Sequence, residues 1–289
     1  MFAHLRPGAL NKPQLCRRIR LPQCRGILAQ HAPAQSKVTN TTPIISLPKA
    51  AKMAHNQVFQ YSIVSALVDG VASHGTPIAR VLEHGDHGLG TFRNMVGEMI
   101  VLDGDVYQMK ADGSVVHIDP EQTVTPFATV TRFKPTIKER ATVVGKAGLE
   151  RLLTGLFPKA RNHFLVVRMD GVFKEVNVRT AGGQTKPREG MVAVCARQTT
   201  HTFTNVKGTI VGFRCPQYVM GVNVAGDHFH FIAEDRQRGG HILAFETEGD
   251  VDISAAQMSK FHLELPTEDD EFNEAELKLQ AQDIKKAEG

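Results

Sequence analysis

The stretch GDHFHFIAEDRQRGGHILAFET, residues 226–247, holds two strand-like runs on either side of a polar, glycine-rich turn. The runs cover residues 227–234 and 241–247, and the turn covers residues 235–240. Aromatic and β-branched side chains favour strands, and the paired glycines favour a tight return of the chain. The stretch therefore predicts an antiparallel hairpin.

Three histidines lie in this predicted hairpin. Side chains i and i+2 of a strand share a face, so His228 and His230 point the same way, while Phe229 and Phe231 point to the opposite, apolar side. The return of the chain can set His241 beside the pair. Three histidines that leave a position open are typical of catalytic zinc. The pattern predicts a divalent metal site, with ordinary polar-face histidines as the alternative.

Other candidate groups lie far away in the sequence. The segment HGDHG at residues 84–88 is a competing metal site, but its spacing across a glycine turn favours a loop with local hydrogen bonds. A catalytic metal needs acid–base groups nearby, and Glu98 and Arg179 are candidates because each stands on a strand-like run. A solvated surface charge is the alternative for both, and spacing alone cannot bring either to the histidines.

The charge of the chain is uneven. The formal net charge is +4, yet residues 1–52 contain nine Lys or Arg and no Asp or Glu, so the remainder is net acidic. This argues against a nucleic-acid surface on the globular part. Residues 1–52 match a mitochondrial-type transit peptide, with a disordered extension or a start at Met53 as alternatives. We expect a cytoplasmic protein, or a mitochondrial one if residues 1–52 are a transit peptide.

Neither membrane insertion nor a disulfide framework is indicated. No run approaches the roughly 18 consecutive apolar residues of a spanning helix. The four cysteines include no CxxC pair, so we expect reduced thiols, with Cys195 and Cys215 buried. A reactive thiol at Cys215 is the alternative.

The remaining patterns are mostly short strands. Hairpins are predicted at residues 97–109 and around residues 111–113, and a helical segment within residues 137–156. A turn is predicted at Asp170-Gly171. Strand-like runs follow at residues 164–169, 172–180, 191–196, 201–206, 208–214 and 219–226. Short strands with glycine-marked turns predict an antiparallel barrel or sandwich.

Several segments together resemble the alpha-acetolactate decarboxylase family. They are HGDHGLGTF (84–92), GEMIVLDGDVYQ (97–108), TPFATVTRF (125–133), VVRMDGVFKEVNVRT (166–180), NVKGTIVGFRCPQY (205–218) and GVNVAGDHFHFIAEDRQRGGHIL (221–243). The resemblance runs through the body of the chain, from about residue 56 onward, and leaves out residues 1–52.

The resemblance implies an α/β (α+β-like) fold with a mixed β-sheet subdomain, a small β-barrel subdomain and the metal site between them. We expect the following division: a basic leader at 1–52, disordered or targeting; the mixed-sheet subdomain at 53–160; the barrel with the HxH metal site at 161–265; an acidic, helical C-terminal tail at 266–289. Family members are typically homodimers, so a homodimer is expected.

The resemblance also implies the site residues. Zinc is expected on His228, His230 and His241. The catalytic positions that match the family's motifs are Glu98, Arg179 and Thr91. A glutamate from the tail is expected to fold over the metal; Glu288 matches best, and Glu276 stays an alternative.

The implied reaction is the zinc-dependent decarboxylation of 2-acetolactate to (R)-acetoin and CO2, a step of acetoin and butanediol biosynthesis. Zinc is expected to act as the Lewis acid that stabilises an enediolate, with Arg and Glu assisting carboxylate binding and protonation. No organic cofactor is needed because the substrate's own ketone accepts the electrons. The alternatives are a cupin-like metal-dependent hydrolase or oxygenase, and a metal- or acid-binding barrel without turnover.

The sequence departs from the family pattern at two places. Ala225 and Asp227 flank Gly226 where a proline and an aromatic residue are more usual, and residues 185–192 lack the usual aromatic–proline run. Neither change touches a proposed ligand. We therefore expect the shape of the substrate pocket, rather than the chemistry, to differ.

Overall fold

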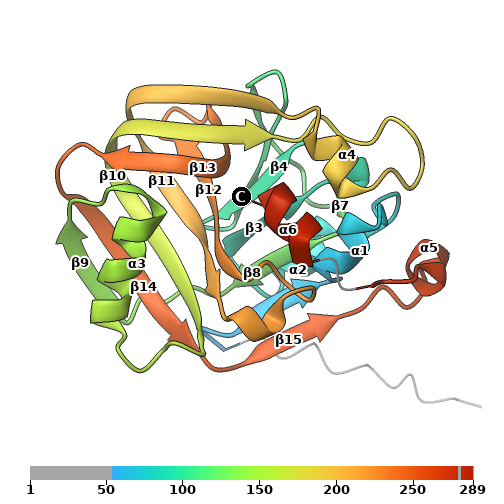
Figure 1. Cartoon of the computed structure of the whole chain (residues 1–289), viewed down its shortest axis with the longest axis horizontal. Coiled ribbons are helices and arrows are strands. Elements are labelled where there is room, and N and C mark those ends of the chain that lie inside the picture. The colour runs from blue at the N-terminus through green and yellow to red at the C-terminus, as the bar shows by residue number, and fades with distance from the viewer. Residues whose placement is uncertain (1–53, 279–280, 289) are drawn as a thin grey trace, which may run out of the picture. The chain divides into compact units, whose positions relative to one another are not determined.

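Two β-sheets meet at the hairpin that carries the histidines (Figure 1). The computed structural model describes residues 54–278 and 281–288, without the side chain of Glu288. All described residues belong to one compact unit, Lys49–Gly289. The predictions for residues 1–52 lie outside the described residues. No helix in the described ranges is long and apolar enough to cross a membrane.

The first sheet is mixed and has the strand order β15-β1-β8-β3-β4-β5-β6. Strands β1 and β15 pair in parallel, and the other neighbours are antiparallel. Its strands are β1 (Val58–Tyr61), β3 (His87–Thr91), β4 (Glu98–Leu102), β5 (Asp105–Met109), β6 (Val115–His117), β8 (Ala128–Thr131) and β15 (Phe261–Glu264). A separate pair joins β2 (Thr76–Pro77) to β7 (Val124–Thr125).

The second sheet is antiparallel and nearly closed. Its order is β11-β12-β13-β10-β14-β9, and β11 pairs again with β10, so four strands return on themselves. Its strands are β9 (Ile137–Ala141), β10 (Phe164–Thr180), β11 (Thr199–Cys215), β12 (Gly226–Ala233), β13 (Gly239–Thr247) and β14 (Val251–Met258). The second sheet is built from consecutive strands, β9 to β14, and β15 then returns the chain to the first sheet.

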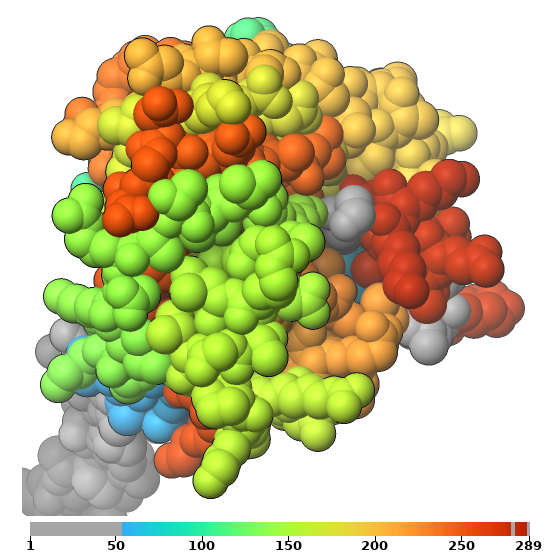
Figure 2. All heavy atoms as spheres, turned by 60° about the vertical axis from the view of Figure 1, so that its left-hand side comes forward, coloured from blue at the N-terminus to red at the C-terminus, as the bar shows by residue number. Residues whose placement is uncertain are grey.

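The helices in the described ranges are short, so the fold is mostly β rather than the expected α/β. They are α1 (Val64–Val68), α2 (Ile78–Leu82), α3 (Gly145–Leu156), α4 (Met191–Cys195), α5 (Asp270–Glu274) and α6 (Ala281–Glu288), with 3-10 turns η1 (Arg93–Met95) and η2 (Gln217–Val219). Helix α3, in green, lies in front of the second sheet in Figure 1 and contacts β13; in Figure 2, green atoms lie directly below orange-red ones on this side of the molecule. Helix α6 packs against α1 and α4.

Each face of strand β12 is buried against a different partner. Phe229 and Phe231 point into the core inside the second sheet, where Phe231 packs edge-on against Phe173. The opposite face turns toward the first sheet, where Ile232 joins a cluster with Ile100. The sequence pattern predicts this alternation of the two faces, and in the structure the histidine face lies between the sheets.

The two predicted hairpins of the first half are confirmed as β4–β5 and β5–β6. The predicted turn at Asp170-Gly171 is wrong, because β10 runs through it without interruption. A side chain at Gly171 would place its Cβ 2.4 Å from Val251 Cγ1, so the glycine permits close approach of β14. In the same way, residues 201–206 and 208–214 form one strand, β11. Glycine marks close contact here rather than a break.

Two other segments differ from the predicted elements. The predicted strand at residues 191–196 is instead helix α4, Met191–Cys195, in which Met191 and Val194 lie one turn apart and are both buried. Residues 219–226 are largely irregular, and the buried amide of Asn223 anchors them by donating to Gln60 Oε1 (2.7 Å). The predicted helical segment within residues 137–156 is confirmed as α3, which begins at Gly145 after strand β9.

Acid is expected to destabilise the fold through His87. Burial lowers the pKa of His87 from 6.5 to about 4, although its Nε2 donates to the Val167 carbonyl oxygen (3.3 Å). Below pH 6.5 the unfolded chain binds a proton at this histidine and the folded chain does not. The contribution of His87 to the free energy of unfolding is therefore fully present above pH 6.5. It is lost as the pH falls toward 4, by roughly 3 kcal/mol.

The variant His87→Gln keeps an N–H donor but cannot be protonated. We expect its metal-free form to lose less free energy of unfolding between pH 7 and pH 4.5 than the parent protein, measured by urea denaturation at both pH values. Equal losses in the two proteins would contradict this role of His87. Both proteins contain all the other histidines, so the contribution of those residues cancels when the two losses of free energy are compared.

Candidate metal centre and active site

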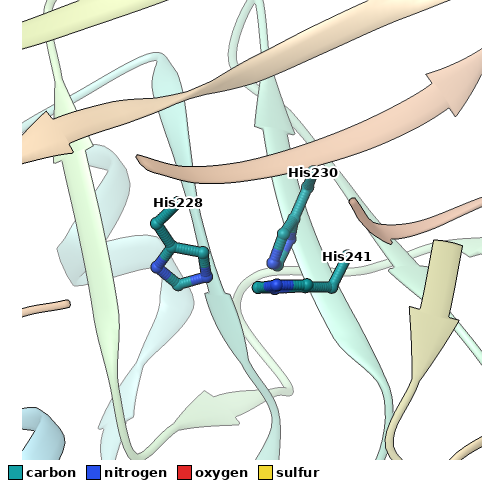
Figure 3. Close-up of side chains that lie close together, drawn as sticks. All are labelled: His228, His230 and His241. Carbon is teal, nitrogen blue, oxygen red and sulfur yellow. The ribbon is translucent and has the colours of Figure 1, made fainter. Parts of the chain in front are cut away.

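The three histidines of the hairpin converge on one point (Figure 3). His230 and His241 are direct partners across β12 and β13, and His228 precedes His230 by two residues on the same face. One ring nitrogen from each lies within 4.8 Å of those of the others, and the ring centroids are 5.1–5.4 Å apart. All three are buried. In the described ranges, no other group of three buried side chains has metal-ligand geometry.

The electrostatics of the site keep His228 and His241 neutral. Burial, reinforced by Arg179 and Lys146, lowers the pKa of His228 to about 3. Burial and Arg179 also lower the pKa of His241 well below its usual value. Metal ligation requires a neutral imidazole with a lone pair on nitrogen.

The orientation of His230 also suits metal ligation. Its Nδ1 donates to the Met99 carbonyl oxygen (2.7 Å), so the proton sits on Nδ1 and Nε2 carries the lone pair that can bind a metal. The nitrogen donors are those that zinc accepts. The residues present therefore fit a divalent metal held by three imidazoles.

Arg179 continues the row of histidines across the sheet. It pairs with His241 between β10 and β13, as His241 pairs with His230 between β13 and β12. Its neighbour Val178 points into the core inside the sheet, so Arg179 faces the histidine side. The guanidinium is buried, with Nη1 3.6 Å from Glu98 Oε1. The register thus brings Arg179 to the site.

Glu98 reaches the same site from the first sheet. Its Oε2 lies 3.7 Å from His230 Nε2, and its Oε1 accepts a hydrogen bond from the Ala181 backbone N–H (3.3 Å). Side chains alternate between the two faces of β4, and Glu98 shares its face with Ile100, which packs against the second sheet. The side chain of Glu98 is therefore buried between the sheets. A carboxylate, a guanidinium and three imidazoles from two sheets therefore surround one small volume.

Thr91 stands beside Glu98 and lines the adjoining pocket. The two are direct partners across β3 and β4, and Thr91 Oγ1 donates to the Gly97 carbonyl oxygen (2.8 Å). This bond ties Thr91 to the residue that precedes Glu98. The pocket is a cavity of about 40 Å³ that Glu98, Arg179 and His228 also line. Its remaining walls are mostly apolar and come from α1, α4 and the first sheet.

Two polar residues near the site were not predicted. Cys195, at the end of α4, is partly buried and lies with Sγ 3.7 Å from Arg179 Nη1. Lys146, in the first turn of α3, contributes to the lowered pKa of His228 and His241. Both stand on short helices without a motif, so no pattern in the sequence indicates them.

Several sequence candidates lie elsewhere. His84 stacks on Phe59 with ring centroids 3.9 Å apart and joins no metal-ligand group within the described residues, and neither does His87. Cys215 is buried and burial raises the pKa of its thiol, which argues against a reactive thiol. Glu276 is exposed and paired with Lys278.

The tail glutamate Glu288 has a side chain outside the described residues. The helix that carries it, α6, is described, and its Ile284 and Ala287 are buried in one cluster with Leu67 and Val194. Leu67 and Val194 also line the pocket beside the histidines. The C-terminal helix therefore packs on two helices that form the pocket wall.

Comparisons with known proteins identify a family with this fold. Residues 58–279 match the family model described as Alpha-acetolactate decarboxylase. The alpha-acetolactate decarboxylase of Klebsiella aerogenes is 40% identical over 229 residues, which cover 79% of this chain and 86% of that protein. That of Methanosarcina mazei is 38% identical over 270 residues, which cover 92% of each. The crystal structure of alpha-acetolactate decarboxylase from Bacillus subtilis strain 168 aligns with a TM-score of 0.76 at 34% identity, over 81% of this chain and 99% of that one. Sequence and fold agree over the same long region, and the chain belongs to the alpha-acetolactate decarboxylase family.

Proposed function

We propose that this protein decarboxylates 2-acetolactate to (R)-acetoin and CO2 with a bound zinc ion. The observation that carries the proposal is the buried group of three histidines with Glu98 and Arg179 beside it. The family name of the relatives supports the substrate. A three-imidazole site stays cationic when it holds a divalent metal, which suits an anionic substrate.

His228, His230 and His241 would hold the ion, and zinc is the metal that best fits three nitrogen ligands with positions left open. When bound, the ion would supply a Lewis acid where negative charge develops as CO2 leaves. Burial of the site strengthens this interaction because little water screens it. The hydrogen bond from His230 Nδ1 to Met99 keeps one ligand oriented before the substrate arrives.

Arg179 would hold the substrate carboxylate or the oxygen that becomes negative. Its guanidinium is a planar fork of donors that matches a carboxylate. The contacts of Nη1 with Glu98 Oε1 (3.6 Å) and Cys195 Sγ (3.7 Å) fix the side chain at the pocket. By holding the carboxylate, the guanidinium would orient the substrate within the pocket that Glu98 and His228 also line.

Glu98 would move the proton that replaces CO2. Its carboxyl group is within 4 Å of both His230 and Arg179, so it reaches the atoms that the other groups hold. Because Glu98 projects from the first sheet, its carboxyl group would meet a bound substrate from one side only. Delivery to one face produces one hand of acetoin.

Thr91 and Glu288 complete the proposed catalytic set. Thr91 keeps Gly97, and with it the start of β4, in place through its hydrogen bond, and lines the pocket itself. For Glu288 the support is the family resemblance of the tail together with the packing of α6 on the pocket wall. We further propose, from the same resemblance, a homodimer in which the nearly closed second sheet serves as a small barrel.

A product assay tests this function. Purified protein is incubated with racemic 2-acetolactate under argon and in air, and acetoin and CO2 are measured. We expect equal amounts of the two products at the same rate in both atmospheres. A requirement for oxygen would favour the cupin-like oxygenase instead, and absence of acetoin under both conditions would contradict the proposal.

Replacing Arg179 with lysine is expected to lower kcat/KM for acetolactate by about 10- to 100-fold, mainly through KM, because the forked contact to the carboxylate is lost. Metal content should be unchanged. Steady-state kinetics and elemental analysis check this. The matched control is Arg168→Lys, on the same strand, where the arginine contacts Asp103 and Asp170 (2.7 Å each). Equal kinetics in the two variants would contradict the role of Arg179.

A further inference from the structure

The ligand His228 lies where strand β12 is supported from one side only. Strand β11 pairs with β12 along its whole length, from Gly226 to Ala233. Strand β13 pairs with β12 only from His230 to Ile232. His230 and His241 are therefore enclosed by strands on both sides, and His228 is not. Gly226, with a φ of +96°, lies two residues before it and is preceded by irregular chain.

A forked ion pair stands at this weakly supported end. Arg214 on β11 and Asp227 on β12 are direct cross-strand partners. Arg214 Nε donates to Asp227 Oδ1 (2.6 Å), and Nη2 donates to Oδ2 (2.8 Å). The side chains are 18% and 11% exposed, so solvent weakens the pair less than it does a surface pair. Such two-pronged contacts fix geometry as well as charge.

The pair lies on the opposite face of β12 from the metal ligands. Asp227 alternates with His228, and Arg214 also donates to the carbonyl oxygen of Glu150 in α3 (3.5 Å). The charges that lower the pKa of His228 are those of Arg179 and Lys146, and Asp227 is not among them. The pair can therefore influence His228 through the backbone of β12 rather than by its own field.

We propose that Arg214 and Asp227 are positioning residues that hold the start of β12 so that His228 meets the metal together with His230 and His241. The inference rests on the proposed metal chemistry. It also gives a structural role to a departure from the resembled family, because Asp227 stands where an aromatic residue is more usual. In this chain the ion pair between Arg214 and Asp227 fixes the start of β12.

The test measures metal affinity in Asp227→Asn and Arg214→Lys. Removing a residue that orients a metal ligand typically lowers affinity by about 10- to 100-fold. We expect the dissociation constant for Zn²⁺ to rise by about tenfold or more in both variants, measured by competition with a chromophoric chelator. Arg214→Lys retains the charge but loses the fork, so a loss in both variants assigns the effect to geometry.

The matched control is Glu189→Gln. Glu189 forms a comparable forked pair with Arg197, at 2.8 Å for each prong, on the segment around α4 rather than beside a ligand. Its loss should lower the melting temperature of the metal-free protein without changing Zn²⁺ affinity by more than about twofold. A general effect of losing a forked ion pair is thereby separated from the positioning of His228.

Cobalt gives a readout that stability alone does not move. In the Co²⁺-loaded protein the visible ligand-field bands report coordination geometry, and we expect them to shift in intensity and position in Asp227→Asn but not in Glu189→Gln. Parental affinity and a parental spectrum in Asp227→Asn would overturn the positioning role of the pair and leave the proposed metal chemistry standing. Equal affinity loss in Glu189→Gln would overturn it as well. If the parent protein binds neither Zn²⁺ nor Co²⁺, the proposed metal chemistry and this inference both fail.

Discussion

Replacing His230 with alanine is expected to remove the bound metal and to lower kcat/KM for acetolactate by about 10⁴-fold or more. His230 lies at one end of the row that runs through His241 to Arg179, and its Nδ1 hydrogen bond to Met99 orients it toward the common point. Two imidazoles cannot enclose the ion as three do. The variant should therefore lose both the metal and the chemistry that depends on it.

Metal content by elemental analysis and acetoin formation check this expectation in the same preparation. His87→Gln is the matched control, since it also removes a buried histidine from between the sheets. The control should keep its metal and turn over within a few-fold of the parent. Acetoin formation at the parental rate by His230→Ala, once stripped of metal, would contradict the account.

Replacing Glu98 with glutamine is expected to lower kcat by roughly 10²- to 10⁴-fold, the usual contribution of a positioned acid or base. The amide has nearly the same shape and can still accept the Ala181 N–H, but it cannot move a proton. Metal content should therefore stay at the parental level. The acetoin that does form should also be less enriched in one hand, because solvent supplies the proton without a preferred face.

Steady-state kinetics, metal analysis and chiral chromatography of acetoin measure these three quantities. Glu189→Gln is the matched control, since Glu189 and Glu98 are each 7% exposed. We expect the control to keep the parental kcat and the parental ratio of acetoin enantiomers. Parental kcat in Glu98→Gln would remove the carboxyl group from the proton transfer.

The sequence predicts the histidine hairpin well because the information is local. Side chains alternate along residues 228–231, which puts the histidines on one face and the phenylalanines on the other. The glycine-rich return then sets His241 opposite His230. The meeting of Glu98 with Arg179 is different in kind. It depends on the packing of one sheet on another, which spacing along the chain does not specify, and only the family resemblance anticipates it.

The prediction errors have a common physical source. Gly171 and Gly208 resemble turn residues, yet in the structure each allows a neighbouring strand to come close. The length of β10 and β11 is thus set by tertiary packing that the local sequence does not show. Lys146 and Cys195 escape prediction for a related reason, since each reaches the site only through the placement of a short helix.

The most direct test of the metal-dependent account is stoichiometric reconstitution. Parent protein is freed of metal with a chelator and titrated with Zn²⁺, while bound metal and acetoin formation from 2-acetolactate are measured together. The account predicts no acetoin from the metal-free protein and full activity at one bound ion per chain. Full activity in the metal-free protein, or activity restored only by iron in the presence of oxygen, would contradict it.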